Sequence, residues 1–258
     1  MKVLLAVIVI TAVVSAACSS TPRPTPPPAN MHAQVLATMP HDTGAFTEGL
    51  ELVGSDLYEG TGLEGKSDVR VTDPATGAVK KRVALPASMF GEGITVVGDK
   101  LWQLTYQDGV AIQRDRNTLA EIRRARYDGE GWGLCHDGER LVMSNGTDQL
   151  TFRDPDTFAQ VGQVSVRADG EPVAMLNELE CTPAGVYANI WQTDTIVRID
   201  PRSGDVTASV DLSGLLSAAE RANTDVLNGI AAVPGTDEFL VTGKNWPKIF
   251  RVKFVTTR

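Results

Sequence analysis

A pattern that recurs five times along the chain constrains the fold more than any other feature of this sequence. Each unit opens with a polar or aromatic residue set among glycines and aliphatic residues, and these register residues are Glu48, Glu92, Trp132, Glu178 and Asn228. They are spaced by 44, 40, 46 and 50 residues, and a second apolar stretch follows each of them 8 to 11 residues later. Turn residues separate the two stretches, which predicts a β-hairpin in every unit.

A third stretch in each unit alternates between apolar and polar residues, as in Val69-Arg70-Val71, and period two is typical of a strand. A fourth stretch closes the first four units, at residues 79–85, 121–127, 160–166 and 205–212. Four strands in roughly 45 residues are typical of a propeller blade. We therefore expect an all-β protein, a five-bladed β-propeller with four antiparallel strands per blade. An open β-sandwich is the alternative fold.

The last unit ends at Arg258 without a fourth strand, whereas the segment 33–37 precedes the first unit without a partner. We expect this N-terminal strand to complete the last blade and close the ring. The propeller domain is therefore predicted at residues 33–258.

The N-terminus resembles a secretory signal peptide over residues 1–17, because a lysine precedes an apolar run that is shorter than a spanning helix needs. Ser15-Ala16-Ala17 stands directly before Cys18, similar to the bacterial lipoprotein cleavage box, although an aliphatic residue is usual at Ser15. Residues 18–32 are predicted to be the lipid-attachment cysteine and a Pro-rich tether.

These features predict an exported protein of the bacterial cell envelope, held at the outer surface of a membrane only by a lipid on Cys18. Ordinary signal cleavage is the alternative and would give a secreted or periplasmic protein. The net charge of −8 argues against a nucleic-acid partner, which needs a basic surface. The three histidines and three cysteines show no metal-ligand spacing. We expect a monomer with no metal and no organic cofactor.

Polar and aromatic residues are predicted to gather at one mouth of the channel. Antiparallel pairing brings the register residues to the same face as the ends of the second strands, near Gly62, Tyr106, Gly146, Trp191 and Lys244. Glu92 stands between two glycines and beside Phe90, and a carboxyl group against an aromatic wall has a raised pKa that suits proton transfer. The alternative is that Glu92 only binds backbone amides at the axis.

Six short segments stand in order along the blades: AFTEGL (45–50), FGEGIT (90–95), GWGL (131–134), LNELE (176–180), ANIWQ (188–192) and TGKNWP (242–247). Together they resemble the plant-type glutaminyl cyclotransferases, a family of five-bladed propellers from plants and bacteria. The resemblance covers about residues 35–254.

The resemblance implies that Glu92 is the proton shuttle. It also implies substrate-lining positions at Phe46, Phe90, Trp132, Asn177, Trp191 and Lys244. Two further expected substrate contacts depart from the family pattern. Glu48 stands where the family has glutamine, and Tyr106 falls where a tryptophan can occur. Glu48 is expected to bind the substrate's α-ammonium, to raise the pKa of Glu92, or to alter the substrate preference.

The activity implied by the resemblance is a metal-independent glutaminyl-peptide cyclotransferase, which converts N-terminal glutamine of peptides or proteins to pyroglutamate and releases ammonia. Glu92 would be its general acid and base. Oxyanion donors are expected among Trp132, Trp191, Asn177 and Lys244. Two other classes stay open: a non-enzymatic propeller lipoprotein that binds or scaffolds at the cell surface, and a metal-dependent hydrolase.

Cys135 and Cys181 each lie three residues after the register residue of their own blade. They occupy equivalent depths on adjacent inner strands, so a disulfide between them is possible in an exported protein. The alternative is two buried free thiols.

Overall fold

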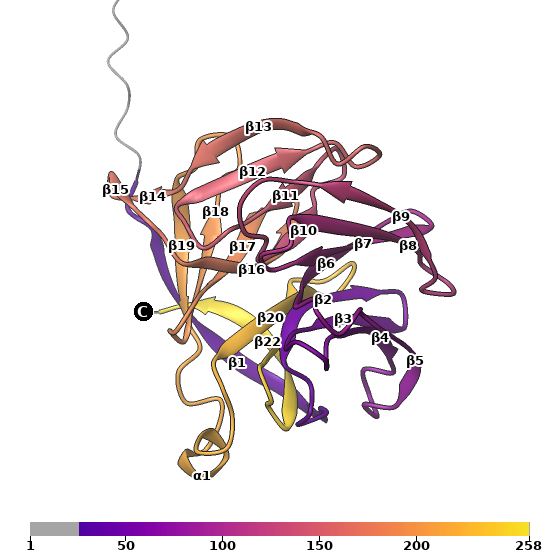
Figure 1. Ribbon diagram of the computed structural model, residues 1–258. Coiled ribbons are helices and arrows are strands. Elements are labelled where there is room, and N and C mark those ends of the chain that lie inside the picture. Colours follow the sequence, from indigo (N-terminus) through magenta and orange to yellow (C-terminus); the bar gives the residue numbers. More distant parts are fainter. Residues whose placement is uncertain (1–25, 258) are drawn as a thin grey trace, which may run out of the picture.

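In the computed structural model, which describes residues 26–257, the chain forms a ring of five antiparallel blades (Figure 1). Three blades are separate four-stranded sheets. Blade 1 consists of β2 (Thr47–Val53), β3 (Asp56–Thr61), β4 (Asp68–Thr72) and β5 (Val79–Ala84). Blade 2 consists of β6 (Gly91–Val97), β7 (Lys100–Thr105), β8 (Val110–Asp115) and β9 (Glu121–Arg126). Blade 3 consists of β10 (Leu134–His136), β11 (Leu141–Met143), β12 (Gln149–Arg153) and β13 (Gln160–Ser165). The predicted signal peptide and Cys18 lie outside the described residues.

Blades 4 and 5 form one eight-stranded sheet, in which β1 joins the two blades. Blade 4 is β16 (Leu176–Thr182), β17 (Gly185–Ile190), β18 (Thr195–Ile199) and β19 (Val206–Asp211); blade 5 is β20 (Leu227–Ala232), β21 (Glu238–Gly243), β22 (Lys248–Thr256) and β1 (Ala29–Pro40). The predicted five-bladed propeller is confirmed.

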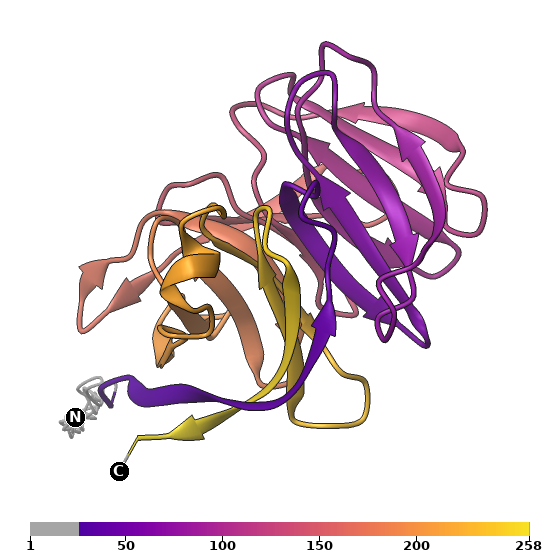
Figure 2. The same cartoon turned by 90° about the horizontal axis from the view of Figure 1, so that it is seen from below.

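Strand β1 closes the ring as predicted, because it pairs antiparallel with β22 from Met31 opposite Thr256 to Pro40 opposite Lys248. Figure 2 shows the indigo β1 beside the yellow β22. The strand begins earlier than expected, at Ala29, so the last four residues of the predicted tether belong to it. These residues pair in parallel with β19. Without them, the outer edge of β19 would be unpaired between blades 4 and 5.

The core is divided into layers between neighbouring blades. Leu50 and Leu240 belong to the layer between blades 1 and 5, and Trp102 and Leu134 to the layer between blades 2 and 3. Blades 4 and 5 are held by the largest layer, which includes the nearly stacked rings of Phe239 and Phe254. Each blade contributes apolar side chains from both faces of its sheet. Every blade therefore packs against both of its neighbours, and this packing holds the ring together.

Two small elements interrupt the repeat. A hairpin of β14 (Arg167–Ala168) and β15 (Glu171–Pro172) lies between blades 3 and 4, and the short helix α1 (Ala218–Arg221) lies between blades 4 and 5. Ser217 and Glu220 form a capping box at the start of α1. Over residues 26–257, none of the helical segments is long and apolar enough to cross a membrane.

A disulfide joins Cys135 on β10 to Cys181 on β16, with their Cα atoms 5.4 Å apart. It links the innermost strands of blades 3 and 4 and closes a loop with a sequence separation of 46. A covalent link between neighbouring blades restricts the unfolded chain and thereby stabilises the folded ring.

Replacing both cysteines by alanine is expected to lower the free energy of unfolding by about 2–4 kcal/mol, because the unfolded chain regains the freedom that the link removes. Urea denaturation of the wild type and the Cys135→Ala/Cys181→Ala variant measures the difference. Two reactive thiols in the denatured, unreduced wild-type domain would show that the bond is absent.

Candidate active site

The inner strands are irregular at the register residues themselves. The pairing of the inner strand with the next strand shifts between Thr47 and Gly49 in blade 1 and between Gly91 and Ile94 in blade 2. Blades 4 and 5 show the same shift between Leu176 and Leu179 and between Leu227 and Ile230. A bulge inserts an extra residue and redirects its side chain. The repeat thus delivers Glu48, Glu92, Asn177 and Asn228 to the same end of the channel.

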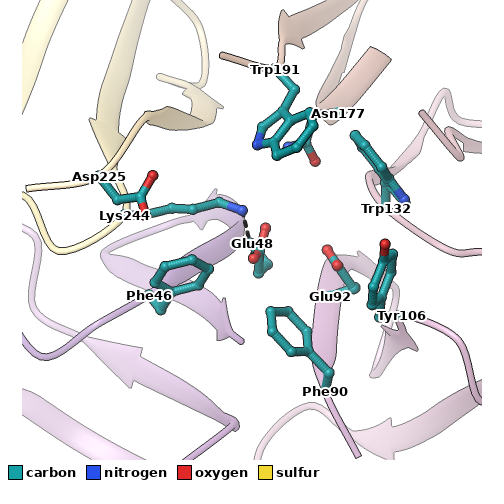
Figure 3. Close-up of a pocket in the computed structure, with 10 residues that line it drawn as sticks. All are labelled: Phe46, Glu48, Phe90, Glu92, Tyr106, Trp132, Asn177, Trp191, Asp225 and Lys244. Atoms are coloured by element: carbon teal, nitrogen blue, oxygen red, sulfur yellow. Dashed lines mark hydrogen bonds and ion pairs between the residues drawn. The ribbon is translucent and has the colours of Figure 1, made fainter. Parts of the chain in front are cut away.

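A pocket with a volume of about 220 Å³ lies at this end (Figure 3). It is lined by Phe46, Glu48, Phe90, Glu92, Tyr106, Trp132, Asn177, Trp191, Asp225 and Lys244. All nine residues predicted from the sequence are present in this wall. Pockets for drug-sized ligands measure roughly 300–1,000 Å³, so this one suits a single amino-acid side chain.

Asp225 is the lining residue that the sequence reasoning missed. It comes from the loop that follows α1 and lies three residues before the register residue Asn228. Phe46 and Phe90 also line the pocket, and they stand two residues before their own register residues. A similar place shortly before a register residue was the signal that could have identified Asp225.

Five aromatic rings form an arc around the pocket: Phe46, Phe90, Tyr106, Trp132 and Trp191. The centroids of neighbouring rings lie between 5.5 and 6.5 Å apart. Lys244 closes the arc with its Nζ 4.6 Å from the centroid of Phe46. Gly62 makes room for the arc, because a Cβ atom there would collide with the ring of Phe90.

Glu48 and Glu92 occupy the centre of this ring of side chains (Figure 3), and they are 1% and 5% exposed. Glu48 Oε1 lies 2.7 Å from Lys244 Nζ, and Glu48 Oε2 accepts a hydrogen bond of 3.1 Å from Asn228 Nδ2. The two carboxyl groups are close enough for each to shift the pKa of the other. Glu92 Oε2 is buried and, within the described chain, has no hydrogen-bond partner. One oxygen of the acid pair is therefore free for a ligand.

Burial dominates the ionisation of the acid pair. It raises the pKa of Glu92 well above the usual value, and the negative charge of Glu48 raises it further. Burial also raises the pKa of Glu48, to about 7, although the Lys244 ammonium opposes that shift. The pair therefore holds a proton at neutral pH, on Glu92, while Glu48 faces the Lys244 cation.

One of the predicted oxyanion donors, Trp132, already has a hydrogen-bond acceptor in the structure. Trp132 Nε1 donates a hydrogen bond of 3.0 Å to Glu130 Oε2, so its N–H is already engaged. The sequence could not reveal this, since it depends on the rotamer of a loop glutamate. Glu178 supports the framework, because its carboxylate accepts from the backbone N–H groups of Leu50 and Ile230 at 3.1 and 2.8 Å.

Among residues 26–257, no three or more His, Cys, Asp and Glu side chains are grouped so that they could hold a metal ion. The groups that the pocket offers for chemistry are a free carboxyl oxygen, an ammonium group and aromatic walls. These features define a class of protein: a propeller with a small, desolvated acid–base pocket at one mouth of its channel.

Residues 5–254 match the family Glutamine cyclotransferase, and the chain belongs to this family. The glutaminyl-peptide cyclotransferase of Arabidopsis thaliana is 40% identical over 226 residues, which cover 85% of this chain and 70% of that protein. The crystal structure of Myxococcus xanthus glutaminyl cyclase superimposes with a TM-score of 0.81 at 36% identity, covering 90% of this chain and 100% of the other. The Cps50 (Swd1) β-propeller domain of Myceliophteria thermophila, with a TM-score of 0.50 and 10% identity over 87% of this chain and 100% of that one, shares the fold alone.

Proposed function

We propose that this chain converts the N-terminal glutamine of peptides to pyroglutamate and releases ammonia, with Glu92 as the general acid and base. The observation that carries the proposal is the buried, unpartnered oxygen of Glu92 inside a pocket sized for one side chain. The family membership supports the reaction, since the Arabidopsis relative is by name a glutaminyl-peptide cyclotransferase and the Myxococcus protein a glutaminyl cyclase.

In the proposed reaction the α-amino nitrogen of glutamine attacks the Cδ atom of its own side chain and closes a five-membered ring. In its ionised form, Glu92 takes a proton from this nitrogen and then gives it to the amide nitrogen as the Cδ–N bond breaks, so that ammonia leaves. Glu92 ends in the state in which it began. The free α-amine has a pKa of roughly 7.7–8.0, so a carboxyl group with a raised pKa is well matched to exchange protons with it.

The negative charge that develops on the Cδ oxygen needs donors, and Lys244 supplies one in this proposal. An ammonium group has three N–H bonds, and the ion pair with Glu48 Oε1 uses one of them. Trp191 lies on the same side of the pocket and offers its indole N–H as a second donor. The aromatic arc excludes water and holds the glutamine in the folded-back geometry that ring closure needs.

The test is incubation of the purified protein with a Gln-initiated peptide, followed by mass spectrometry and an ammonia assay. We expect one ammonia per peptide, the same rate with a metal chelator, and no reaction with an Nα-acetylated peptide. An intact Gln peptide after incubation with folded protein would refute the function. Loss of activity with chelator, restored by zinc, would refute the metal-independent mechanism.

Removing the charge of Glu48 is expected to move the acid limb of kcat/KM to lower pH. The Glu48 carboxylate raises the pKa of Glu92, so the Glu48→Gln change lowers that pKa and the basic form appears at lower pH. The pH–rate profile measures the shift, with Glu64→Gln, an exposed glutamate on a neighbouring loop, as control. An acid limb that stays in place or moves to higher pH would contradict this role of Glu48.

We also propose export and lipid anchoring at Cys18, on the sequence features of residues 1–32. Cys18→Ala is expected to move the protein from the membrane fraction to the soluble fraction, which cell fractionation measures. Mass spectrometry of the wild type should find the acyl chains on this cysteine. An unmodified Cys18 in membrane-bound wild type would contradict the proposal.

A further inference from the structure

His41 is a buried, titratable residue that the proposed reaction does not use. It lies in the loop between β1 and β2, where the chain passes from blade 5 to blade 1, and its side chain is 5% exposed. Its Nδ1 lies 2.7 Å from the carbonyl oxygen of Trp246, and its Nε2 lies 2.9 Å from Glu59 Oε1. A carbonyl and a carboxylate can only accept, so both ring nitrogens must donate. Only the charged imidazolium has both protons.

The surroundings of His41 favour that charged form. Glu59 faces it from β3, Asp42 follows it in the chain, and Arg70 on β4 lies 2.8 Å from Asp42 and 4.0 Å from Glu59. From blade 5 the ring meets the hydroxyl of Thr242 at 3.3 Å. Burial by itself would lower the pKa of His41, but the charge and hydrogen bond of Glu59 outweigh it and hold the pKa above its usual value.

Both partners of the Lys244–Glu48 ion pair are tied to this histidine. The Trp246 carbonyl belongs to the turn that carries Lys244, and the His41 backbone N–H also donates to Pro247 O in the same turn. On the other side, Thr47 Oγ1 donates a hydrogen bond of 2.8 Å to Glu59 Oε1, the same oxygen that His41 contacts. Thr47 directly precedes Glu48 in β2. The chain of contacts therefore runs from one half of the ion pair to the other.

We propose that His41 is a positioning residue, whose charged ring clamps the Lys244 turn of blade 5 to the Glu48 strand of blade 1. The inference rests on the proposed function and adds a pH limit to it. When His41 loses its proton, one of the two hydrogen bonds is lost and the turn is released. Since the charged form holds the clamp, activity is present at lower pH and falls as the pH rises through the pKa of His41.

Kinetics test the clamp through the alkaline limb of the pH–rate profile. Glu59→Gln removes the charge that sustains the imidazolium, so it is expected to move this limb to lower pH, which a merely structural contact would not do. His41→Gln is expected to lose roughly 10- to 100-fold in kcat/KM, because a displaced ion pair misplaces the substrate. His32→Gln, at an exposed histidine on β1, is the matched control and should keep wild-type rates.

Two further readouts do not depend on catalysis. Nitrogen chemical shifts of the imidazole should show His41 doubly protonated above pH 6.5, its ordinary pKa. Acetylation of Lys244, followed by peptide mapping, should increase as His41 deprotonates. If His41 titrates at or below 6.5, or if Glu59→Gln changes neither the alkaline limb nor Lys244 acetylation, the proposal is wrong. If no peptide is cyclised at any pH while both readouts hold, the clamp stands and the proposed function fails.

Discussion

Glu92→Gln is expected to lower kcat for cyclisation of a Gln-initiated peptide by roughly 10²–10⁴-fold, the usual contribution of a general acid–base group. Glutamine preserves the size of the side chain but cannot exchange the proton. KM is expected to change little, since the aromatic arc and Lys244 remain. Steady-state kinetics by ammonia release measures the effect, and wild-type turnover by the variant would remove Glu92 from the mechanism.

Glu178→Gln provides the contrast that separates a reacting carboxyl group from a structural one. Both Glu178 oxygens accept from backbone N–H groups, so an amide there leaves one buried N–H without an acceptor. This variant is expected to lose about 1–3 kcal/mol of stability. Glu92→Gln breaks no hydrogen bond from a backbone N–H and should unfold close to the wild type. Equal destabilisation of both variants in urea would indicate that Glu92 is a framework residue.

Lys244→Met is expected to lower the free energy of unfolding by about 1–2 kcal/mol at pH 8, because it removes the cation of the buried Glu48 carboxylate, which then takes up a proton at a cost of about 1.4 kcal/mol per pH unit above 7. The loss should shrink below pH 7, since the pKa of Glu48 is already raised to about 7 and rises further without the ammonium group, so the neutral form takes over. Urea denaturation at the two pH values measures both effects.

The double variant Lys244→Met/Glu48→Gln is the control for this prediction. It removes the unpaired charge together with the cation and should recover most of the stability at pH 8, while turnover stays low because a donor to the oxyanion is missing. A single variant as stable as the wild type at pH 8 would show that Glu48 does not carry the charge assigned to it.

The blades could be predicted because their signals are local. Alternation marks a strand such as β4, and the end of each predicted fourth strand lies within one residue of the end observed for β5, β9, β13 and β19. The extent of β1 could not be read in this way, since residues 29–32 become strand by pairing with β19 and, at Met31 and His32, also with β22, both far along the chain. Helix α1 had a local signal, the Ser217–Glu220 capping box, but it lies outside the repeated strand pattern and was not predicted.

The candidate site was predictable as a set of residues, because the register of the repeat decides which side chains reach the channel mouth. The contacts among them were not. The ion pair of Lys244 with Glu48 and the use of the Trp132 N–H by Glu130 depend on rotamers and on loops that no period governs. His41 lies before the first register residue and carried no signal, since its role comes from a turn more than 200 positions away.

A crystal structure of Glu92→Gln with a bound Gln-initiated peptide tests the central claim most directly. We expect the glutamine side chain inside the aromatic arc, its α-nitrogen within hydrogen-bond distance of residue 92, and its amide oxygen facing Lys244. A peptide bound outside this pocket, or an α-nitrogen directed away from residue 92, would contradict the assigned chemistry.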